Sequence, residues 1–325
     1  ILLIGHAGNP TPVLLNFFLF VLITPVFSQS IMKSMYLNQA LGQASEAIGR
    51  LEDLLSYESL PVPSSPKTLK DFSIQFNRVS FRYPGTTQKA IDGISFKIPQ
   101  GKRVALVGAS GGGKTTLARL VPRFWETTEG EVMIGNINVK DIAPNELMRN
   151  ISFVFQNTKL FKTTLLENIK YGNPTATLPE IEKAVNMAQC REIIDKLPLG
   201  LNTKIGSEGT YLSGGEQQRI VLARTFLKNA PIIVLDEATA FADPENEHLI
   251  QQALKELTKG KTVLMIAHRL SSITDADNIL VIDKGKVAEQ GTHAKLIQQQ
   301  GIYNHMWNEY LQSVRWTIGK EVAHA

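Results

Sequence analysis

A glycine-rich segment carries the residues best suited to chemistry. It runs from Gly108 to Thr115 (GASGGGKT) and matches the pattern G-x-x-x-x-G-K-[ST] directly after the apolar run RVALV and before a helix-like run. Glycines let backbone N–H groups curl around phosphate oxygens, and the following helix N-terminus adds a favourable dipole. Lys114 would reach the terminal phosphates and the Thr115 hydroxyl would ligate Mg²⁺. The segment therefore predicts a phosphate-binding loop, or P-loop, for a nucleotide such as ATP. A purely structural turn has no reason to carry Lys-Thr at this spacing.

An acidic pair, Asp236-Glu237, ends the apolar run that starts at Ile232. A P-loop that holds Mg²⁺ needs an acidic partner for the metal and a base for the attacking water. Asp236 fits the first role and Glu237 the second, because consecutive residues past a strand end project to different neighbours. The alternative is a solvated acidic turn, which is common for an isolated Asp-Glu pair but disfavoured beside a P-loop in the same chain.

The elements that must position these residues follow an alternating pattern. Short β-rich runs, FSIQFNRVSFRY and ISFKI, precede RVALVG, and three later apolar runs alternate with helix-like segments. This alternation is typical of a parallel sheet flanked by helices, so the fold class is α/β. The three later runs are PIIVLD, KTVLMIAH and NILVID.

The N-terminal part has a different character. No Asp, Glu, Lys or Arg occurs from Ile1 to Met32, and Pro12–Phe27 is almost wholly apolar. With its flanks this run approaches the ~20 residues of a membrane-spanning helix, and it lacks the basic start and cleavage site of a secretory signal. Lys33 and then Arg50 follow it, which places its C-terminal end in the cytoplasm. The alternative is a buried helix of a soluble domain, which the long charge-free run disfavours.

A proline-rich stretch that interrupts the helical pattern sets the expected domain boundaries. Helical spacing of apolar residues continues from Gln39 to Tyr57, and the proline-rich stretch Pro61–Thr68 then ends it. We expect residues 1–60 to be the C-terminal fragment of a membrane domain, 61–70 a linker and 71–325 an ATP-binding domain. The chain starts at Ile1 rather than Met, and ILLIGHAGNPTP is typical of a helix end and a turn, so we expect further membrane helices upstream.

Composition excludes several function classes. The 325 residues carry a net charge of only +4, from 34 basic and 30 acidic side chains, which is too weak and dispersed for a nucleic-acid groove. Cys190 is the only cysteine, so an internal disulfide and a Cys-based zinc site are both excluded, and we assign it no function. Four histidines lack metal-ligand spacing: His6, His248, His293 and His305.

The octapeptide Leu212–Arg219 (LSGGEQQR) makes the interpretation specific, because it resembles the signature of ABC transporters. Other family elements occur in the family's order: Tyr83 is similar to the adenine-stacking aromatic, Gln156 to the Q-loop, Asp243 to the D-loop acid and His268 to the switch histidine. Taken singly, these residues have ordinary structural explanations. The resemblance covers about Phe72 to Gln300, and the upstream helix and linker resemble the last membrane helix of exporter-fold half-transporters.

The resemblance implies an ABC-type P-loop NTPase domain with an antiparallel β subdomain and a helical subdomain, preceded by a transmembrane helix. It implies three catalytic residues, Glu237, His268 and Gln156, and metal ligation by Thr115, Gln156 and Asp236. ATP would be bound by Tyr83, Gly108, Ser110, Gly111, Gly112, Gly113, Lys114, Thr115, Thr116, Ser213, Gly214 and Gly215. One departure is visible: the D-loop reads AFAD from Ala240 to Asp243 and keeps only the family's acid.

The family's mechanism needs a second subunit. Ser213, Gly214 and Gly215 of one motor would contact the γ-phosphate held by Lys114 of the other, so ATP would join two motors and its hydrolysis would separate them. We therefore expect an ATPase that drives transport across the inner (plasma) membrane, as a multi-pass protein with its ATP-binding domain in the cytoplasm, in a homodimer or a heterodimer.

Two other functions fit the sequence less well. A soluble ABC ATPase of DNA repair or translation would have no membrane helix, and Pro12–Phe27 argues against it. A non-hydrolysing assembly module is disfavoured by Glu237. The segment from Thr24 to Leu55 is similar to half-transporters linked to siderophore traffic, some of which import, so the substrate and the direction of transport stay open.

Overall fold

The computed structural model describes residues 11–56, 60–155, 159–206, 210–236, 244–267 and 269–323. Contacts divide the chain into two compact units, Ile1–Pro61 and Val62–Ala325. The predicted helix end and turn at residues 1–10 lie outside the described residues.

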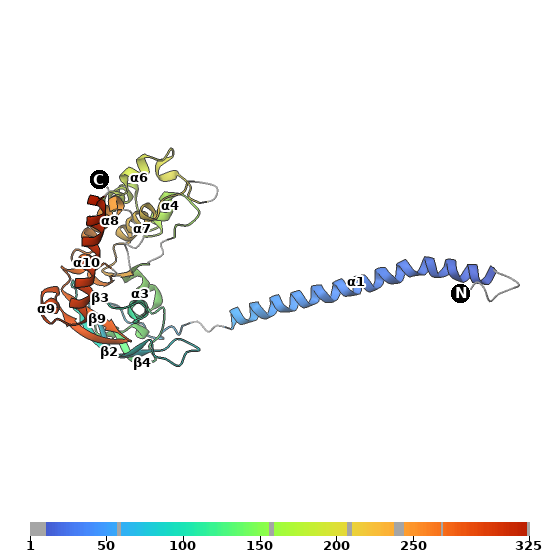
Figure 1. Ribbon diagram of the computed structural model, residues 1–325, viewed down its shortest axis with the longest axis horizontal. Coiled ribbons are helices and arrows are strands. Elements are labelled where there is room, and N and C mark those ends of the chain that lie inside the picture. The colour runs from blue at the N-terminus through green and yellow to red at the C-terminus, as the bar shows by residue number, and fades with distance from the viewer. Residues whose placement is uncertain are drawn as a thin grey trace. The chain divides into compact units, whose positions relative to one another are not determined.

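The described part of unit Ile1–Pro61, residues 11–56 and 60–61, contains one helix, α1 (Thr11–Leu55), drawn in blue in Figure 1. None of its residues is buried, and its large apolar side chains are exposed along the whole length. At 1.5 Å per residue the helix is about 68 Å long, and its charge-free part up to Met32 accounts for about 33 Å. A bilayer core is about 30 Å thick. Among the described helices, α1 is the one long and apolar enough to cross a membrane.

Unit Val62–Ala325 is built on a six-stranded sheet with the order β10-β9-β3-β8-β7-β6. All its strands are parallel to their neighbours except β10, which pairs antiparallel with β9. The strands are β3 (Arg103–Val107), β6 (Ile151–Val154), β7 (Ile232–Asp236), β8 (Thr262–Ile266), β9 (Asn278–Asp283) and β10 (Lys286–Gly291). Every residue of β7 is buried, as expected for an apolar strand with both faces covered.

A second, antiparallel sheet has the order β2-β1-β4-β5. Its strands are β1 (Ile74–Phe81), β2 (Ile91–Ile98), β4 (Glu129–Ile134) and β5 (Ile137–Asn138). The inward side chains of β1 and β2 share one hydrophobic core with β3, β8 and helix α2 (Lys114–Leu120), including Phe76, Leu106 and Leu117. Helix α2, which follows the P-loop, therefore packs against strands of both sheets.

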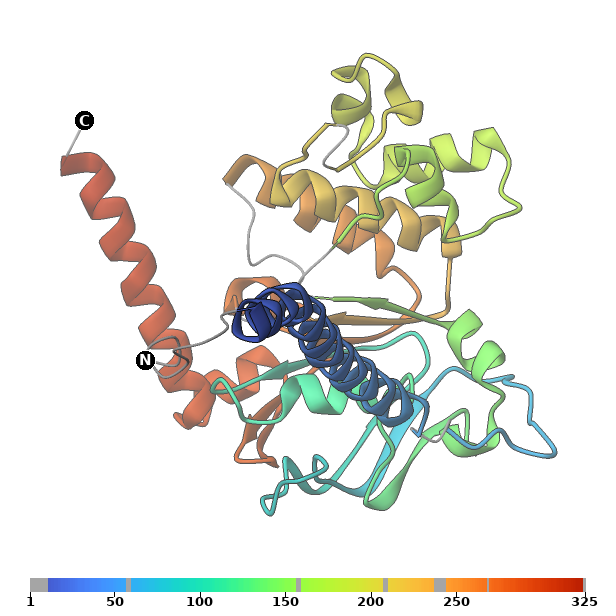
Figure 2. The ribbon, with the colours of Figure 1, turned by 90° about the vertical axis from the view of Figure 1, so that its right-hand side faces the viewer.

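Helices complete this unit. The helices α4 to α7 share a separate core with α8 and group on one side of the strands (Figure 2). Helix α10 packs Tyr303 and Met306 over η3 and β9. The helices are α3 (Pro144–Asn150), α4 (Leu165–Lys170), α5 (Leu178–Met187), α6 (Arg191–Asp195), α7 (Gly214–Lys228), α8 (Pro244–Leu257), α9 (His293–Gln298) and α10 (Ile302–Ala323), with 3₁₀ turns η1 (Val139–Asp141), η2 (Gly200–Asn202) and η3 (Leu270–Ile273). The predicted α/β class, the antiparallel subdomain and the helical subdomain are confirmed.

Candidate nucleotide-binding site

The P-loop connects β3 to α2, as the sequence predicted. Two of its glycines are required by packing. A Cβ at Gly108, whose φ is +136°, would lie 2.1 Å from the carbonyl oxygen of Ile282, and one at Gly113 (φ +106°) would lie 2.7 Å from that of Ala90. Both positions exclude a side chain, and both φ values favour glycine. The loop is therefore fixed against β9 and the start of β2.

Lys114 is held within its own loop. Its side chain is buried, and Nζ donates hydrogen bonds to the carbonyl oxygens of Gly108 (2.9 Å) and Ala109 (2.8 Å). These hydrogen bonds hold the positive charge of the Lys114 amine against the backbone of the P-loop. That placement suits an anionic phosphate chain.

Thr115 and Asp236, which are far apart in sequence, meet at the carboxyl edge of the sheet. Thr115 Oγ1 donates to Asp236 Oδ1 at 3.2 Å, and Asp236 is 3% exposed. Strand β7 lies two strands away from β3, and parallel strands end at the same edge. A hydroxyl and a carboxylate oxygen at this separation, together with phosphate oxygens and water, form the kind of oxygen set that Mg²⁺ prefers. The residues present therefore fit a magnesium ion.

Tyr83 lies beside the P-loop. Its hydroxyl shares a 3.0 Å hydrogen bond with Thr116 Oγ1, and its ring makes edge contacts with Phe81 and Trp125 at centroid distances of 4.8 and 5.4 Å. An open cavity of about 770 Å³ is lined by Tyr83, the following residues 85–90, P-loop residues 109–112 and residues 283–285. An aromatic ring and a phosphate-binding loop on one cavity can hold the base and the phosphates of one nucleotide. Sequence reasoning missed Trp125, because its contact with Tyr83 depends on the fold.

The signature segment begins helix α7. Ser213 is its N-cap: Ser213 Oγ accepts from the Glu216 backbone N–H (3.3 Å), and the Ser213 N–H donates to Glu216 Oε2 (2.8 Å). This reciprocal capping box fixes the start of the helix. None of Ser213, Gly214 and Gly215 lines the P-loop cavity. The structure therefore brings Thr115 and Asp236 together, whereas Ser213, Gly214 and Gly215 form the start of helix α7.

Several predicted residues lie outside the described residues: Gln156, Glu237, Asp243 and His268. The strands before three of them, β6, β7 and β8, are neighbours in the sheet and are parallel. Their carboxyl ends therefore meet at the edge that carries Asp236.

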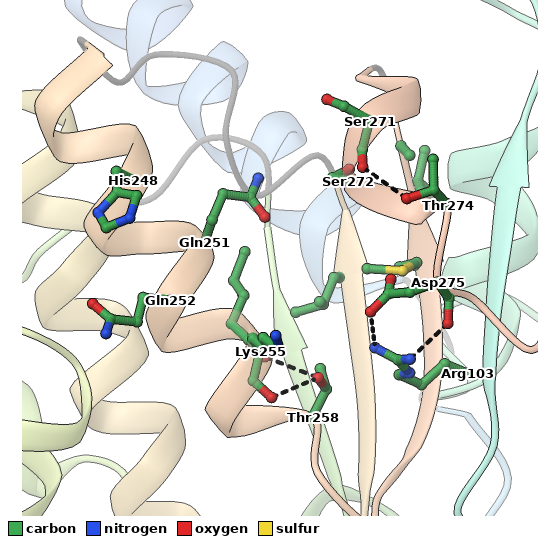
Figure 3. A pocket seen from close by; sticks show the side chains of 15 residues that line it. Arg103, His248, Gln251, Gln252, Lys255, Thr258, Ser271, Ser272, Thr274 and Asp275 are labelled. Atoms are coloured by element: carbon green, nitrogen blue, oxygen red, sulfur yellow. Dashed lines mark hydrogen bonds and ion pairs between the residues drawn. The ribbon is translucent and has the colours of Figure 1, made fainter. Parts of the chain in front are cut away.

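A separate cavity of about 440 Å³ lies between α8, β8 and η3 (Figure 3). Its wall includes Lys255, Ser271 and the pair formed by Arg103 and Asp275, whose side chains bond at 3.0 Å. None of the described residues that line it is a predicted site residue. P-loop residues 109–112, whose backbone amides suit a phosphate, line the P-loop cavity and not this one.

Cys190 has no place in this chemistry. Its side chain is fully buried, and burial raises the pKa of its thiol to about 12. The thiolate needed for a nucleophile or metal ligand is therefore strongly disfavoured.

The P-loop after β3, the Thr115–Asp236 pair and the parallel sheet define a P-loop nucleotide-binding domain. Residues 91–240 match the family model of ABC transporters. The chain therefore carries the ATP-binding domain of the ABC transporter family.

Relatives extend this result. The chain is 44% identical over 247 residues to a Staphylococcus aureus protein whose name describes a multidrug export ATP-binding/permease protein, with 76% of this chain and 43% of the relative covered. It is 47% identical over 231 residues to the ATP-dependent lipid A-core flippase of Pseudomonas aeruginosa, covering 71% and 38%. A solved bacterial Atm1-family ABC exporter with ATP bound superposes with a TM-score of 0.75 at 38% identity, covering 84% of this chain and 47% of that one. The chain is homologous to exporter-type ABC proteins and spans less than half of their length.

Proposed function

We propose that this chain is the ATP-binding and ATP-hydrolysing part of an ABC half-transporter. In this proposal residues 1–60 are the end of its membrane domain, 61–70 the linker and 71–325 the ATP-binding domain. The observation that carries the proposal is the P-loop arrangement, in which Lys114 is held by loop carbonyls and Thr115 meets Asp236.

The residues divide the chemistry between them. Tyr83 stacks on adenine, while the P-loop amides and Lys114 bind the phosphates. Thr115 and Asp236, with Gln156, hold Mg²⁺, which neutralises charge on the phosphates when bound. Glu237 takes the proton of the attacking water, and His268 and Gln156 complete the catalytic set.

A second subunit supplies the rest of the site. The signature residues Ser213, Gly214 and Gly215 begin a helix whose start does not line this chain's own P-loop cavity. They act on ATP held by Lys114 of a partner subunit, and that subunit's signature acts on ATP held here. Binding of ATP then closes two motors, and loss of the γ-phosphate opens them.

Helix α1 connects this motor to the plasma membrane. Its exposed apolar side chains and charge-free first half match a bilayer core, and Lys33 and Arg50 follow that half on the cytoplasmic side. The protein is then a multi-pass membrane protein whose ATP-binding domain lies in the cytoplasm. Opening and closing of the two ATP-binding domains moves substrate across the membrane.

ATP hydrolysis by the full chain in detergent tests the proposal. We expect hydrolysis that requires Mg²⁺, and we expect Lys114→Ala to lose both nucleotide affinity and activity because the cation that neutralises the terminal phosphates is gone. The matched control is Lys102→Ala, whose exposed amine pairs with Asp277 away from the P-loop. Unchanged affinity and activity in Lys114→Ala would contradict the proposal.

A further inference from the structure

The first turns of α7 and α8 are in close contact at a glycine of α7. Gly215 is buried in the first turn of α7, and a Cβ there would lie 2.7 Å from Cβ of Asn246 and 2.9 Å from its Cγ. Asn246 belongs to the first turn of α8 (Pro244–Leu257). The signature glycine therefore permits close contact between these two helix starts.

One buried cation holds this contact. Arg219 lies one helical turn after Gly215 and is 3% exposed. Its guanidinium donates from Nη2 to Asn246 Oδ1 (2.5 Å) and from Nη1 to the carbonyl oxygen of Gln189 (2.8 Å). A buried guanidinium is costly to leave unpaired, so these bonds constrain α8 against α7.

The hydrogen bond between Arg219 and Asn246 joins the starts of two helices that serve different ATP sites under the proposed function. The start of α7 carries the signature, which acts on ATP held by the partner subunit. Strand β7 ends at Asp236, and residues 237–243 lead from it to α8. That segment contains Glu237, which under the proposed function acts on ATP held by this chain.

We propose that Arg219 is a positioning residue for ATP hydrolysis. Its hydrogen bond to Asn246 fixes the signature at the start of α7 relative to the start of α8. Each chain contributes its signature to the partner's ATP site and its P-loop to its own ATP site. The contact therefore couples these two ATP sites. The inference rests on the proposed function and adds Arg219 and Asn246 to its machinery.

The coupling predicts a specific kinetic defect. The P-loop lies on β3 and α2, which this contact does not include, so ATP affinity of the separate chain stays unchanged when the contact is broken. The rate of hydrolysis falls about tenfold, the scale expected for loss of a hydrogen bond to a charged group. Cooperativity between the two sites falls as well.

Four variants of the full chain in detergent test the proposal. Arg219→Met removes both bonds while keeping an unbranched side chain, and Asn246→Ala removes only the acceptor on α8. Asn246→Asp keeps an acceptor oxygen for Arg219. Arg191→Met is the matched control, because this exposed arginine bonds Glu182 and Asn186 nearby and does not join α7 to α8.

The measurements are kcat, KM and the Hill coefficient for ATP, nucleotide affinity by equilibrium binding, and thermal unfolding. We expect Asn246→Ala and Arg219→Met to lose about tenfold in kcat with a Hill coefficient near one and unchanged nucleotide affinity. We expect Asn246→Asp to restore most of the rate and Arg191→Met to match the unmodified chain.

Three results overturn the inference while leaving the proposed function intact. The first is unchanged kcat and cooperativity in Asn246→Ala. The second is a loss of rate that Asn246→Asp does not restore. The third is a loss of rate in both Asn246 variants that accompanies a loss of ATP affinity or of folded protein. An unmodified chain with no ATP hydrolysis removes the proposed function and this inference together.

Discussion

Replacing Gly108 with alanine adds one methyl group at a point where the backbone of β9 leaves no room for it. The new Cβ would lie 2.1 Å from the Ile282 carbonyl oxygen, and the φ of +136° would be strained for any residue with a side chain. Gly111 is the natural comparison. It also has a positive φ, +76°, but a Cβ there would meet no atom within 4 Å.

The two substitutions therefore differ in cost. Strain at Gly108 costs about 1–3 kcal/mol, and crowding of a packed core adds about 1–3 kcal/mol. We expect Gly108→Ala to lower the free energy of unfolding by about 2–6 kcal/mol. Gly111→Ala carries only the left-handed backbone cost of about 1–2 kcal/mol.

Urea unfolding without nucleotide, followed by tryptophan fluorescence, measures this difference. All three tryptophans, Trp125, Trp307 and Trp316, lie in the unit Val62–Ala325, so the signal reports on that unit alone. We expect a lower urea midpoint for Gly108→Ala than for Gly111→Ala. Equal midpoints, or a lower one for Gly111→Ala, would refute the argument that contact with β9 fixes the loop.

Two further predictions concern the nucleotide. Glu237→Gln should keep ATP binding but nearly abolish turnover, because the amide keeps the shape and removes the base, and ATP should then trap a stable dimer in size-exclusion chromatography. Turnover near the unmodified rate would show that another group is the base. Tyr83→Ala should weaken ATP binding about fivefold or more, since stacking on a base is worth about 1–3 kcal/mol, whereas Tyr83→Phe should keep affinity within about threefold. Equal titration curves for the two Tyr83 variants would remove the stacking role.

Local patterns were enough to predict the fold and much of the loop. The strand RVALV, the glycine-rich turn and the helix from Lys114 are neighbours in sequence, so their order alone predicted β3, the P-loop and α2. The acidic strand end predicted Asp236 as a partner for Mg²⁺ beside the P-loop, and the structure places Asp236 Oδ1 3.2 Å from Thr115 Oγ1.

Contacts between distant segments could not be predicted in this way. Gly108 looks like any loop glycine until β9 is placed against it, and no local pattern indicates that Ile282 supplies the contact. Arg219 ends the signature octapeptide, but its partner Asn246 is 27 positions away and lies on another helix. Such contacts depend on how helices pack, which the periodicity of one helix does not specify.

Mixing two inactive variants tests the central claim that each ATP site is built from two chains. Ser213→Arg puts a bulky cation at the start of α7 without touching its own P-loop, so nucleotide binding by the separate chain should survive while ATP-driven pairing fails. Lys114→Ala damages only the P-loop. In a mixed dimer both lesions fall on one composite site and the other site stays intact.

ATPase activity of the separate variants and of their equimolar mixture is the measurement. We predict that each variant alone is inactive and that the mixture regains hydrolysis from its one intact site. Unimpaired hydrolysis by Ser213→Arg alone, at a dilution that keeps the chain monomeric, would contradict the two-chain site.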